Sequence, residues 1–425
     1  MGEGREESGM ADMQVEFAGV KFKNPVVAAS GPLGRTFEAL KRSILSGVSA
    51  VTLKSCNAVP PQDLQPKPGS HVYPKPAHLF LNRYGLSRVM INWEGVPVDF
   101  TAEKEAEMIE RIKPLAREHD VRIIANVHPD PMYVLDLGMF RKDLVTLMQA
   151  GPDLIELCPC PYHFPPELTY PENIAETLPA IRESNRLIFG AVREEVGVPV
   201  IVKTNGPVLY GTHADFASMG IGTFHITEGP LFYATIVDIE EMEPLVPGPG
   251  VFTYGVHRRP MMNLQVARSR ALGDLELMSS GGMWNANDCI ERMMCGARLV
   301  GLHTAIQYHG HGLFAQILQD ISSFLDRKGL RLKEIEGAAV AKIVDQEAHE
   351  AWMRERDLAD SQIKPVVDME KCNGCSRCAN CIHGGISMQD GQPVLHLDLC
   401  VRCGICESIC PEEAIALERT QGIAS

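Results

Sequence analysis

The chain has 425 residues, of which 45% are hydrophobic and 22% are charged, a composition typical of a globular protein with one large core and a small second domain. A formal net charge of -14 at pH 7 argues against nucleic acid as a partner, since nucleic-acid binding calls for a basic face. No apolar run reaches the roughly 18 residues that span a membrane, and the Glu-rich start lacks the order of a signal peptide, so we expect a cytoplasmic protein.

Short apolar runs alternate with helix-length stretches from a polar start, residues 1–12, which we expect to be disordered, to about residue 326. Each apolar run is rich in Val, Ile, Leu or Ala without strict alternation, as expected of parallel strands covered on both faces. Eight such units favour a closed (β/α)8 TIM barrel at residues 13–329 over a doubly wound sheet. The expected strands are 25–30, 50–55, 122–127, 153–158, 199–204, 223–227, 276–280 and 299–304.

The helices are expected between these strands, at residues 37–46, 102–118, 135–149, 172–195 and 286–295 among others. Two strand-to-helix connections, residues 56–100 and 228–261, are far longer than the usual two to six or so residues. Long connections of this kind usually build or cover a site at the carboxyl ends of the barrel strands. The first is dense in Pro, Gly and aromatic residues, so we expect a folded lid.

A cysteine-rich segment follows the barrel. Residues 330–362 have the pattern of a charged helical connector, and we expect a second domain at residues 363–425. Its last four cysteines have the spacing of bacterial ferredoxins, in which three thiolates bind one 4Fe-4S cluster and the fourth reaches a neighbouring cluster. These are Cys400, Cys403, Cys406 and Cys410. The spacing predicts a small α+β ferredoxin-like domain, with a zinc site as the alternative.

A second run of four cysteines lies upstream and predicts a second 4Fe-4S cluster. The ferredoxin pattern implies that the last cysteine of each run completes the cluster of the other run. This run departs from the pattern at Cys381, which follows after only two residues and has His383 near the place where proline is expected. The implied ligand sets are Cys372, Cys375, Cys378 and Cys410 for one cluster, and Cys400, Cys403, Cys406 and Cys381 for the other.

Glycines follow the last two predicted strands of the barrel. Gly281 and Gly282 come after the seventh strand, and Gly301 lies in the eighth, which closes on His303 and Thr304. Barrel enzymes often hold a phosphate on backbone N–H groups at these two strand ends. A single Gly-Gly pair is more often an ordinary turn, but together the two signals predict a phosphate-bearing cofactor.

Two lysines end otherwise apolar strands, Lys54 in the second and Lys203 in the fifth. Their ammonium groups are expected at the mouth of the barrel, where a buried cation needs a negative partner. A reduced flavin, which is negative around N1 and O2, supplies one. The alternative is a salt bridge to Glu156 or Glu228.

The same stretches resemble a known family. From about Val15 to Asp326 the chain resembles the dihydroorotate dehydrogenase barrel, through AGVKFKNPVVAASGPLG, VTLKS, LNRYGLS, VPVIVKT, YGVHRRP, SSGG and CGARLVGLHTAI. With the cysteine runs it resembles the C-terminal, pyrimidine-reducing part of dihydropyrimidine dehydrogenase. The resemblance implies that Asn82 faces the substrate. It implies FMN contacts from Ala29, Ser30, Lys54, Asn126, Lys203, Gly255, Gly281, Gly282, His303 and Thr304.

Two carboxylates depart from the family pattern. Glu156 and Glu228 stand near the ends of the fourth and sixth strands, where the family has asparagines that hold the amide edges of a pyrimidine. An ionised carboxylate only accepts hydrogen bonds, so both residues are expected to bind a substrate rich in N–H donors or positive charge. Orotate, an anion, would be repelled.

The proton donor is ambiguous at the sequence level. The family's Cys-Pro pair matches Cys160-Pro161 or, with a different gap, Cys158-Pro159. We favour Cys160 as the catalytic acid, because a thiol there can deliver a proton opposite the hydride, with Cys158 as a buried strand residue. His163 in the same loop is the alternative acid.

These features predict an FMN oxidoreductase that reduces or oxidises a C=C or C=N bond in a small polar, nitrogen-containing molecule. No G-x-G-x-x-G follows a strand, so the electrons are expected from an NAD(P)H-oxidising flavoprotein subunit or a ferredoxin. A homo-oligomer is expected as well. The alternatives are a dihydropyrimidine or dihydroorotate dehydrogenase subunit and a non-catalytic electron-transfer module.

Overall fold

The computed structural model divides into two compact units, Met1–Ile343 and Val344–Ser425, which are described separately. None of the described helices is long and apolar enough to cross a membrane. The structure describes residues 12–57, 78–80, 90–92, 101–129, 137–158, 171–227, 232–234, 237–238, 243–244, 250–253, 259–343, 347–348, 350–351 and 363–419.

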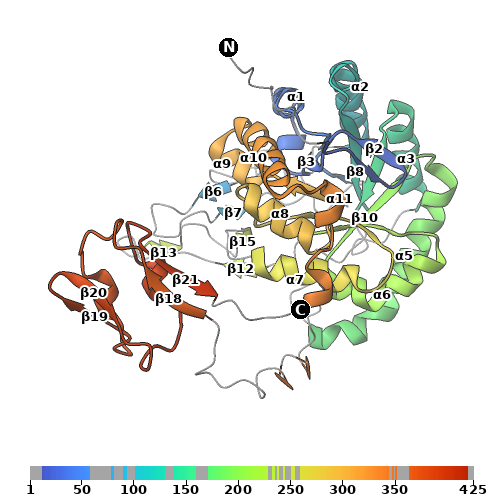
Figure 1. Ribbon diagram of the computed structural model, residues 1–425. Helices are drawn as coiled ribbons and strands as arrows, with labels where there is room; N and C mark the ends of the chain where they lie inside the picture. Colours follow the sequence, from blue (N-terminus) through green and yellow to red (C-terminus); the bar gives the residue numbers. More distant parts are fainter. Residues whose placement is uncertain are drawn as a thin grey trace, which may run out of the picture. The chain divides into compact units, whose positions relative to one another are not determined.

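The first unit is a closed barrel of eight parallel strands surrounded by helices (Figure 1). The order around the barrel is β4-β3-β17-β16-β11-β10-β9-β8, and pairing of β4 with β8 closes the ring. All eight predicted strands are present, which confirms the TIM barrel. They are β3 (Val26–Ala28), β4 (Ala50–Thr52), β8 (Arg122–His128), β9 (Leu154–Leu157), β10 (Val200–Thr204), β11 (Thr223–Ile226), β16 (Glu276–Ser280) and β17 (Leu299–Leu302).

Helices follow the strands, and four of them begin at polar caps. The side chains of Thr36, Thr101, Asn205 and Asn285 each accept a hydrogen bond from a backbone N–H three residues later, which satisfies a donor of the first helical turn. The helices are α1 (Phe37–Leu45), α2 (Ala102–Glu118), α3 (Leu137–Ala150), α5 (Pro171–Glu195), α6 (Gly206–Ser218), α7 (Arg259–Arg270), α8 (Ala286–Met294), α9 (Thr304–His309) and α10 (Gly312–Lys328).

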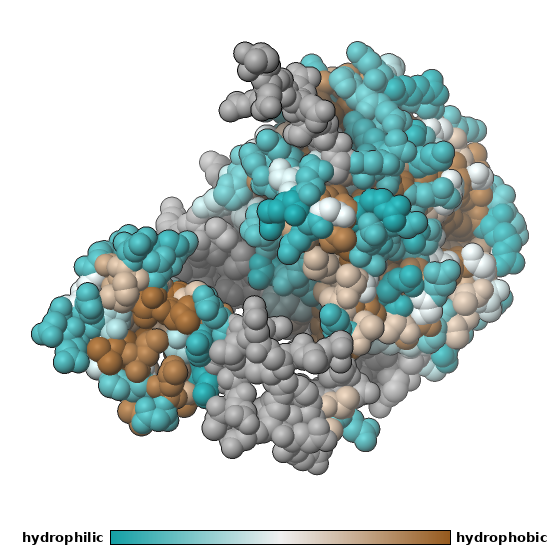
Figure 2. Space-filling model, in the orientation of Figure 1, coloured by the Kyte–Doolittle hydropathy of each residue, from teal (hydrophilic) through white to brown (hydrophobic). Residues whose placement is uncertain are grey.

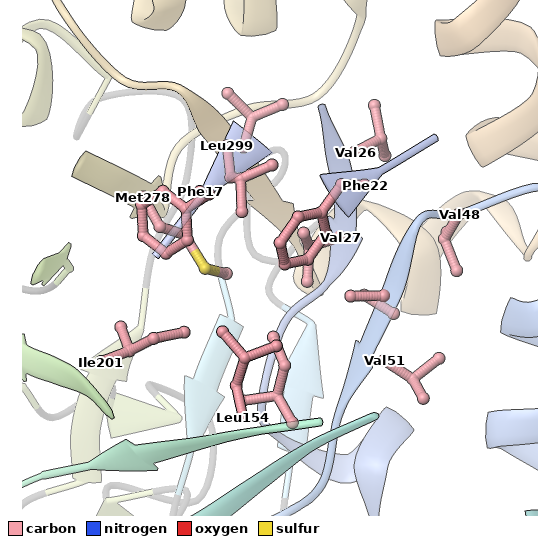
Figure 3. Close-up of a cluster of buried hydrophobic side chains, with 14 of the residues drawn as sticks. Phe17, Phe22, Val26, Val27, Val48, Val51, Leu154, Ile201, Met278 and Leu299 are labelled. Atoms are coloured by element: carbon pink, nitrogen blue, oxygen red, sulfur yellow. The ribbon is translucent and has the colours of Figure 1, made fainter. Parts of the chain in front are cut away.

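A hairpin of β1 (Val15–Phe17) and β2 (Val20–Phe22) covers the amino ends of the barrel strands. Phe17 and Phe22 are buried in edge-to-face contact, and Figure 3 shows them among strand side chains such as Met278. The backbone N–H of Ala18 in the turn donates to Glu276, the first residue of β16. A site in this barrel is therefore expected at the opposite, carboxyl ends of the strands.

The two long connections meet in one antiparallel sheet. Its order is β12 (Phe232–Ala234), β15 (Gly250–Thr253), β7 (Met90–Asn92) and β6 (His78–Phe80). Strands β6 and β7 come from the first connection and pair with each other, and β12 and β15 do the same in the second. The pairing of β15 with β7 joins the two connections. The segments after the second and sixth barrel strands thus associate with each other, which the sequence did not indicate.

The predicted connector at residues 330–362 is only partly separate from the barrel. The first unit extends to Ile343 and includes α11 (Leu332–Ile335) and the short helix η5 (Val340–Lys342). Backbone N–H groups of Gly337 and Ala339 donate to the carbonyls of Met293 and Met294 at the end of α8. Residues 330–343 therefore pack on the barrel, where they donate hydrogen bonds to carbonyl groups at the end of α8.

The second unit is a small α+β fold. Strand β18 (Ile363–Val367) pairs antiparallel with β21 (Ile415–Arg419), which joins the two ends of the unit. A hairpin of β19 (Ile386–Gln389) and β20 (Gln392–Leu395) lies between them in the sequence. Two short helices, η7 (Arg377–Asn380) and α13 (Ile405–Ser408), follow the cysteine turns.

Candidate active site and cysteine cavities

A cavity opens at the carboxyl ends of the barrel strands, the end at which TIM-barrel enzymes have their sites. Its wall combines residues that lie in or directly after β3, β10, β11, β16 and β17, which brings together seven of the predicted FMN contacts. The lining residues are Ala29, Ser30, Lys203, Thr227, Ser280, Gly281, Gly282, Met283, Trp284, Gly301, Leu302, His303, Thr304 and Ala305.

Glycines make this wall approachable by a ligand. Gly281 and Gly282 have φ of 92° and 77°, a left-handed conformation that favours glycine. A Cβ on Gly301 would lie 3.0 Å from the Cβ of Ala29 and 3.1 Å from Cε of Met278. These residues fit a phosphate-bearing group, because the backbone itself forms the surface that such a group requires.

Lys203 lines the cavity and forms an ion pair with Glu156, which does not line it. The Lys203 ammonium lies 3.4 Å from Oε1 of Glu156, whose side chain has no exposed surface. Burial alone would raise the pKa of Glu156, but the proximity of Lys203 and His225 lowers it to about 2. Glu156 is therefore ionised and acts as a negative charge inside the barrel, one layer below the cavity.

A chain of hydrogen bonds leads from Glu156 back to the cavity wall. Oε2 of Glu156 lies 2.6 Å from Nδ1 of His225, and Nε2 of the same ring lies 2.8 Å from Oγ of Ser280. The Ser280 hydroxyl is in turn 3.0 Å from that of Thr227. The sequence did not predict this network, since its members lie far apart along the chain and meet only through the register of β9, β10, β11 and β16.

Two predicted FMN contacts lie outside the cavity wall. Asn126 on β8 is buried and donates from Nδ2 to Oε1 of Glu156 over 2.5 Å. Lys54 follows β4, and its backbone N–H donates to the carbonyl of Gly34 over 3.0 Å. Both still lie at or near the carboxyl ends of their strands, next to the site.

Several predicted residues fall outside the described part of the chain. Cys158, at the end of β9, is described and buried, as expected of a strand residue. The residues that follow it, 159–170, lie outside the described ranges. The predictions for Asn82, Cys160, His163, Glu228 and Gly255 therefore remain sequence-based expectations.

In the second unit, the cysteines border two cavities. The lining of one includes Cys372, Cys375, Cys378 and Cys410. The lining of the other includes Cys381, Cys400, Cys403 and Cys406, together with Cys378. The last cysteine of each run thus borders the cavity of the other run, which is the exchange that the ferredoxin pattern implies.

Cys381, where the sequence departs from the ferredoxin spacing, lies in a nest of backbone amides. Hydrogen bonds from the backbone N–H of His383 and of the residues up to Ile386 lower the pKa of the Cys381 thiol. The thiolate needed by iron is therefore favoured at this position. Exposed Ile382, Val401 and Ile405 lie on the same cavity, and Figure 2 shows hydrophobic side chains on the surface of this unit.

Comparisons with known proteins agree with both units. A dihydroorotate dehydrogenase family model matches residues 168–325, and a 4Fe-4S binding domain model matches residues 393–416. The second range contains Cys400, Cys403, Cys406 and Cys410.

Three similar proteins each align with 74% to 77% of this chain. Dihydroorotate dehydrogenase B (NAD(+)), catalytic subunit, from Methanocaldococcus jannaschii is 28% identical over 77% of this chain and 98% of its own length. The same enzyme from Methanocella arvoryzae is 29% identical over 76% of this chain and 95% of its own. Dihydropyrimidine dehydrogenase (NADP(+)), chloroplastic, from Arabidopsis thaliana is 24% identical over 74% of this chain and 73% of its own length. The chain is thus an oxidoreductase that is similar to dihydroorotate and dihydropyrimidine dehydrogenases, with a TIM barrel and a C-terminal ferredoxin-like 4Fe-4S region.

Proposed function

We propose that this chain is an FMN- and iron–sulfur-dependent oxidoreductase that reduces or oxidises a C=C or C=N bond in a small polar, nitrogen-containing substrate. Electrons pass to or from an external donor through two 4Fe-4S clusters, one in each cysteine cavity. Bound FMN supplies hydride exchange with the substrate. The observation that carries the proposal is the barrel cavity, where the glycine turn of Gly281 and Gly282 and the Lys203 ammonium line one wall.

The barrel residues bind and orient the cofactor. Backbone amides after β16 and β17 hold its phosphate, at Gly281, Gly282, His303 and Thr304. The Lys203 ammonium stabilises negative charge on the isoalloxazine, as a cation held in place by a buried carboxylate can do. The other contacts proposed from the resemblance are Ala29, Ser30, Lys54, Asn126 and Gly255.

For Glu156 we propose a role other than the substrate contact that its place in the sequence indicates. Oε1 accepts a hydrogen bond from Asn126 and faces the Lys203 ammonium, and Oε2 lies next to Nδ1 of His225. The side chain has no exposed surface. The carboxylate therefore presents no exposed oxygen to a substrate. We therefore assign Glu156 as the counter-ion of Lys203 and keep Asn82 and Glu228 as the proposed substrate contacts.

The proton opposite the hydride is proposed to come from Cys160, with His163 as the alternative acid. Both residues belong to the segment 159–170, which follows β9 along the chain and lies outside the described ranges. A thiol or an imidazole can transfer a proton near neutral pH, which a substrate of this class requires.

The cysteine cavities support the assignment of eight ligands. Cys372, Cys375, Cys378 and Cys410 would bind one cluster, and Cys381, Cys400, Cys403 and Cys406 the other. Two clusters in series imply a partner that exchanges single electrons, either an NAD(P)H-oxidising flavoprotein subunit or a ferredoxin. We further propose that the chain forms a homo-oligomer.

A second candidate is a dihydropyrimidine or dihydroorotate dehydrogenase subunit, which the names of the relatives favour. The test is anaerobic titration of the oxidised protein with uracil, dihydrouracil and dihydroorotate, and with donor-rich or cationic analogues, while flavin absorbance is recorded. Bleaching of the flavin by dihydrouracil or dihydroorotate, or reoxidation of the reduced protein by uracil, would support the second candidate. Redox change only with the analogues would support the first. A flavin that responds to electron donors but to none of these compounds would indicate an electron-transfer module.

A further inference from the structure

We propose that Arg292 is a positioning residue for the cofactor's phosphate, acting from behind the glycine turn that lines the barrel cavity. The inference rests on the proposed function, since it concerns the same cavity. It adds a buried arginine on α8 that no sequence motif identifies and that does not itself line the cavity.

Arg292 is the largest fully buried side chain among the described residues, and its hydrogen bonds all go to neutral groups. Nε donates to Oδ1 of Asn263 over 2.7 Å, and Nη1 donates to Oγ of Ser279 over 2.8 Å. Nη1 also donates to the carbonyl of Ser280 over 3.3 Å, and Nη2 donates to that of Gly281 over 3.0 Å. The guanidinium fork therefore holds two successive peptide carbonyls.

These two bonds set the direction of the amides that face the cavity. In a trans peptide the C=O of one residue and the N–H of the next point in opposite directions. When the carbonyls of Ser280 and Gly281 turn toward Arg292, the N–H groups of Gly281 and Gly282 turn away from it. Gly281 and Gly282 both line the cavity, so their amides are directed to the position proposed for the phosphate.

The charge of Arg292 also favours an anion at this position. Burial lowers the pKa of Arg292 to about 10, so the guanidinium is still protonated at neutral pH. The nearby carboxylate of Asp288 is engaged with Arg259 and with the backbone N–H of Trp284. A buried cation whose bonded partners are all neutral is costly, and an anion seated on the adjacent turn offsets that cost. A phosphate is such an anion.

The test compares two ligands that differ only in the phosphate. The full chain, freed of flavin, is titrated with FMN and with riboflavin, with inorganic phosphate as a competitor, for the wild type and for Arg292→Met. Loss of one charge and of two oriented amides should weaken FMN binding at least roughly tenfold, while riboflavin binding changes little. Inorganic phosphate should compete with FMN less well in the variant. These are binding measurements and need no substrate.

Arg298→Met is the matched control. Arg298 is another arginine of the barrel, partly rather than fully buried, and it pairs with Glu276 and Glu336 at the amino ends of the strands. The ratio of FMN to riboflavin affinity should be unchanged in this variant. If Arg292→Met does not fold, Arg292→Lys keeps the charge but lacks the fork, and it should lower the same ratio to a smaller extent.

Two outcomes would overturn the inference. Equal weakening of FMN and riboflavin would make Arg292 a residue of general structural importance, and an unchanged ratio in both Arg292 variants would remove any link to the phosphate. The proposed function fails separately: in that case the wild-type chain itself would bind neither ligand.

Discussion

Replacing Glu156 by glutamine separates the two roles that this residue can have. The change keeps the size of the side chain and removes its charge. Lys203 would lose its buried counter-ion, whereas Asn126 could still donate to the amide oxygen. His225 could change tautomer to accept from the new NH₂ group and donate to Ser280. The main loss is therefore the ion pair.

The magnitude follows from burial. Removing one partner of a buried ion pair costs about 3–5 kcal/mol, and the rebonding available to glutamine places the expected loss near the lower end, about 3 kcal/mol in the free energy of unfolding at pH 7. The pKa of Glu156 is lowered to about 2 in the folded protein from an ordinary value of 4.5. Its stabilising contribution is thus complete above pH 4.5 and disappears as the pH falls toward 2, so the two proteins should converge in acid.

Denaturant unfolding followed by circular dichroism measures this difference on the flavin-free proteins, at pH 7 and at pH 3. FMN affinity and steady-state kinetics are then measured on the same preparations. If Glu156 is the counter-ion, stability and FMN affinity fall first, and KM for the substrate changes little. Unchanged unfolding together with a tenfold to hundredfold loss of kcat/KM, the amount of roughly one charge-assisted hydrogen bond, would refute the assignment and restore the substrate role.

Two other variants test separate parts of the structure. Cys406→Ala should remove one cluster, lowering the iron content by about half, and leave FMN bound in the barrel; loss of flavin as well would contradict the division into two units. Glu105→Gln concerns a carboxyl on α2 that burial holds at a pKa of about 8, where it accepts from the backbone N–H of Asn126. Since the folded pKa lies above the ordinary 4.5, the contribution of the protonated form is complete below pH 4.5 and is lost as the pH rises through 8. The variant should therefore unfold at higher denaturant than wild type at pH 9 but not at pH 5, and identical pH profiles would be evidence against a neutral Glu105.

The barrel was predictable because its strands are covered on both faces, so each one is an apolar run of the right length. The cavity was predictable for the same reason. Once the strand ends are located, residues such as Gly281 and His303 must gather at one end of the barrel. The spacing of the cysteines predicted which of them share a cavity, and in the structure the last cysteine of each run borders the cavity of the other.

The interior network was not predictable, because it depends on strand register. Lys203 lies opposite His225 in the pairing of β10 with β11, and Asn126 lies opposite Glu156 in the pairing of β8 with β9. A shift of one residue along a strand turns a side chain from one face to the other. Sequence comparison could therefore place Glu156 near the end of β9 but could not show that its side chain points into the barrel core.

The central claim is that one chain carries FMN and two 4Fe-4S clusters. Anaerobically purified protein should contain about eight irons, an equal amount of acid-labile sulfide and one FMN per chain, since the two cavities supply two sets of cysteines and no adenylate-binding motif is present. Zinc in place of iron, about four irons after full reconstitution, or FAD in place of FMN would contradict it.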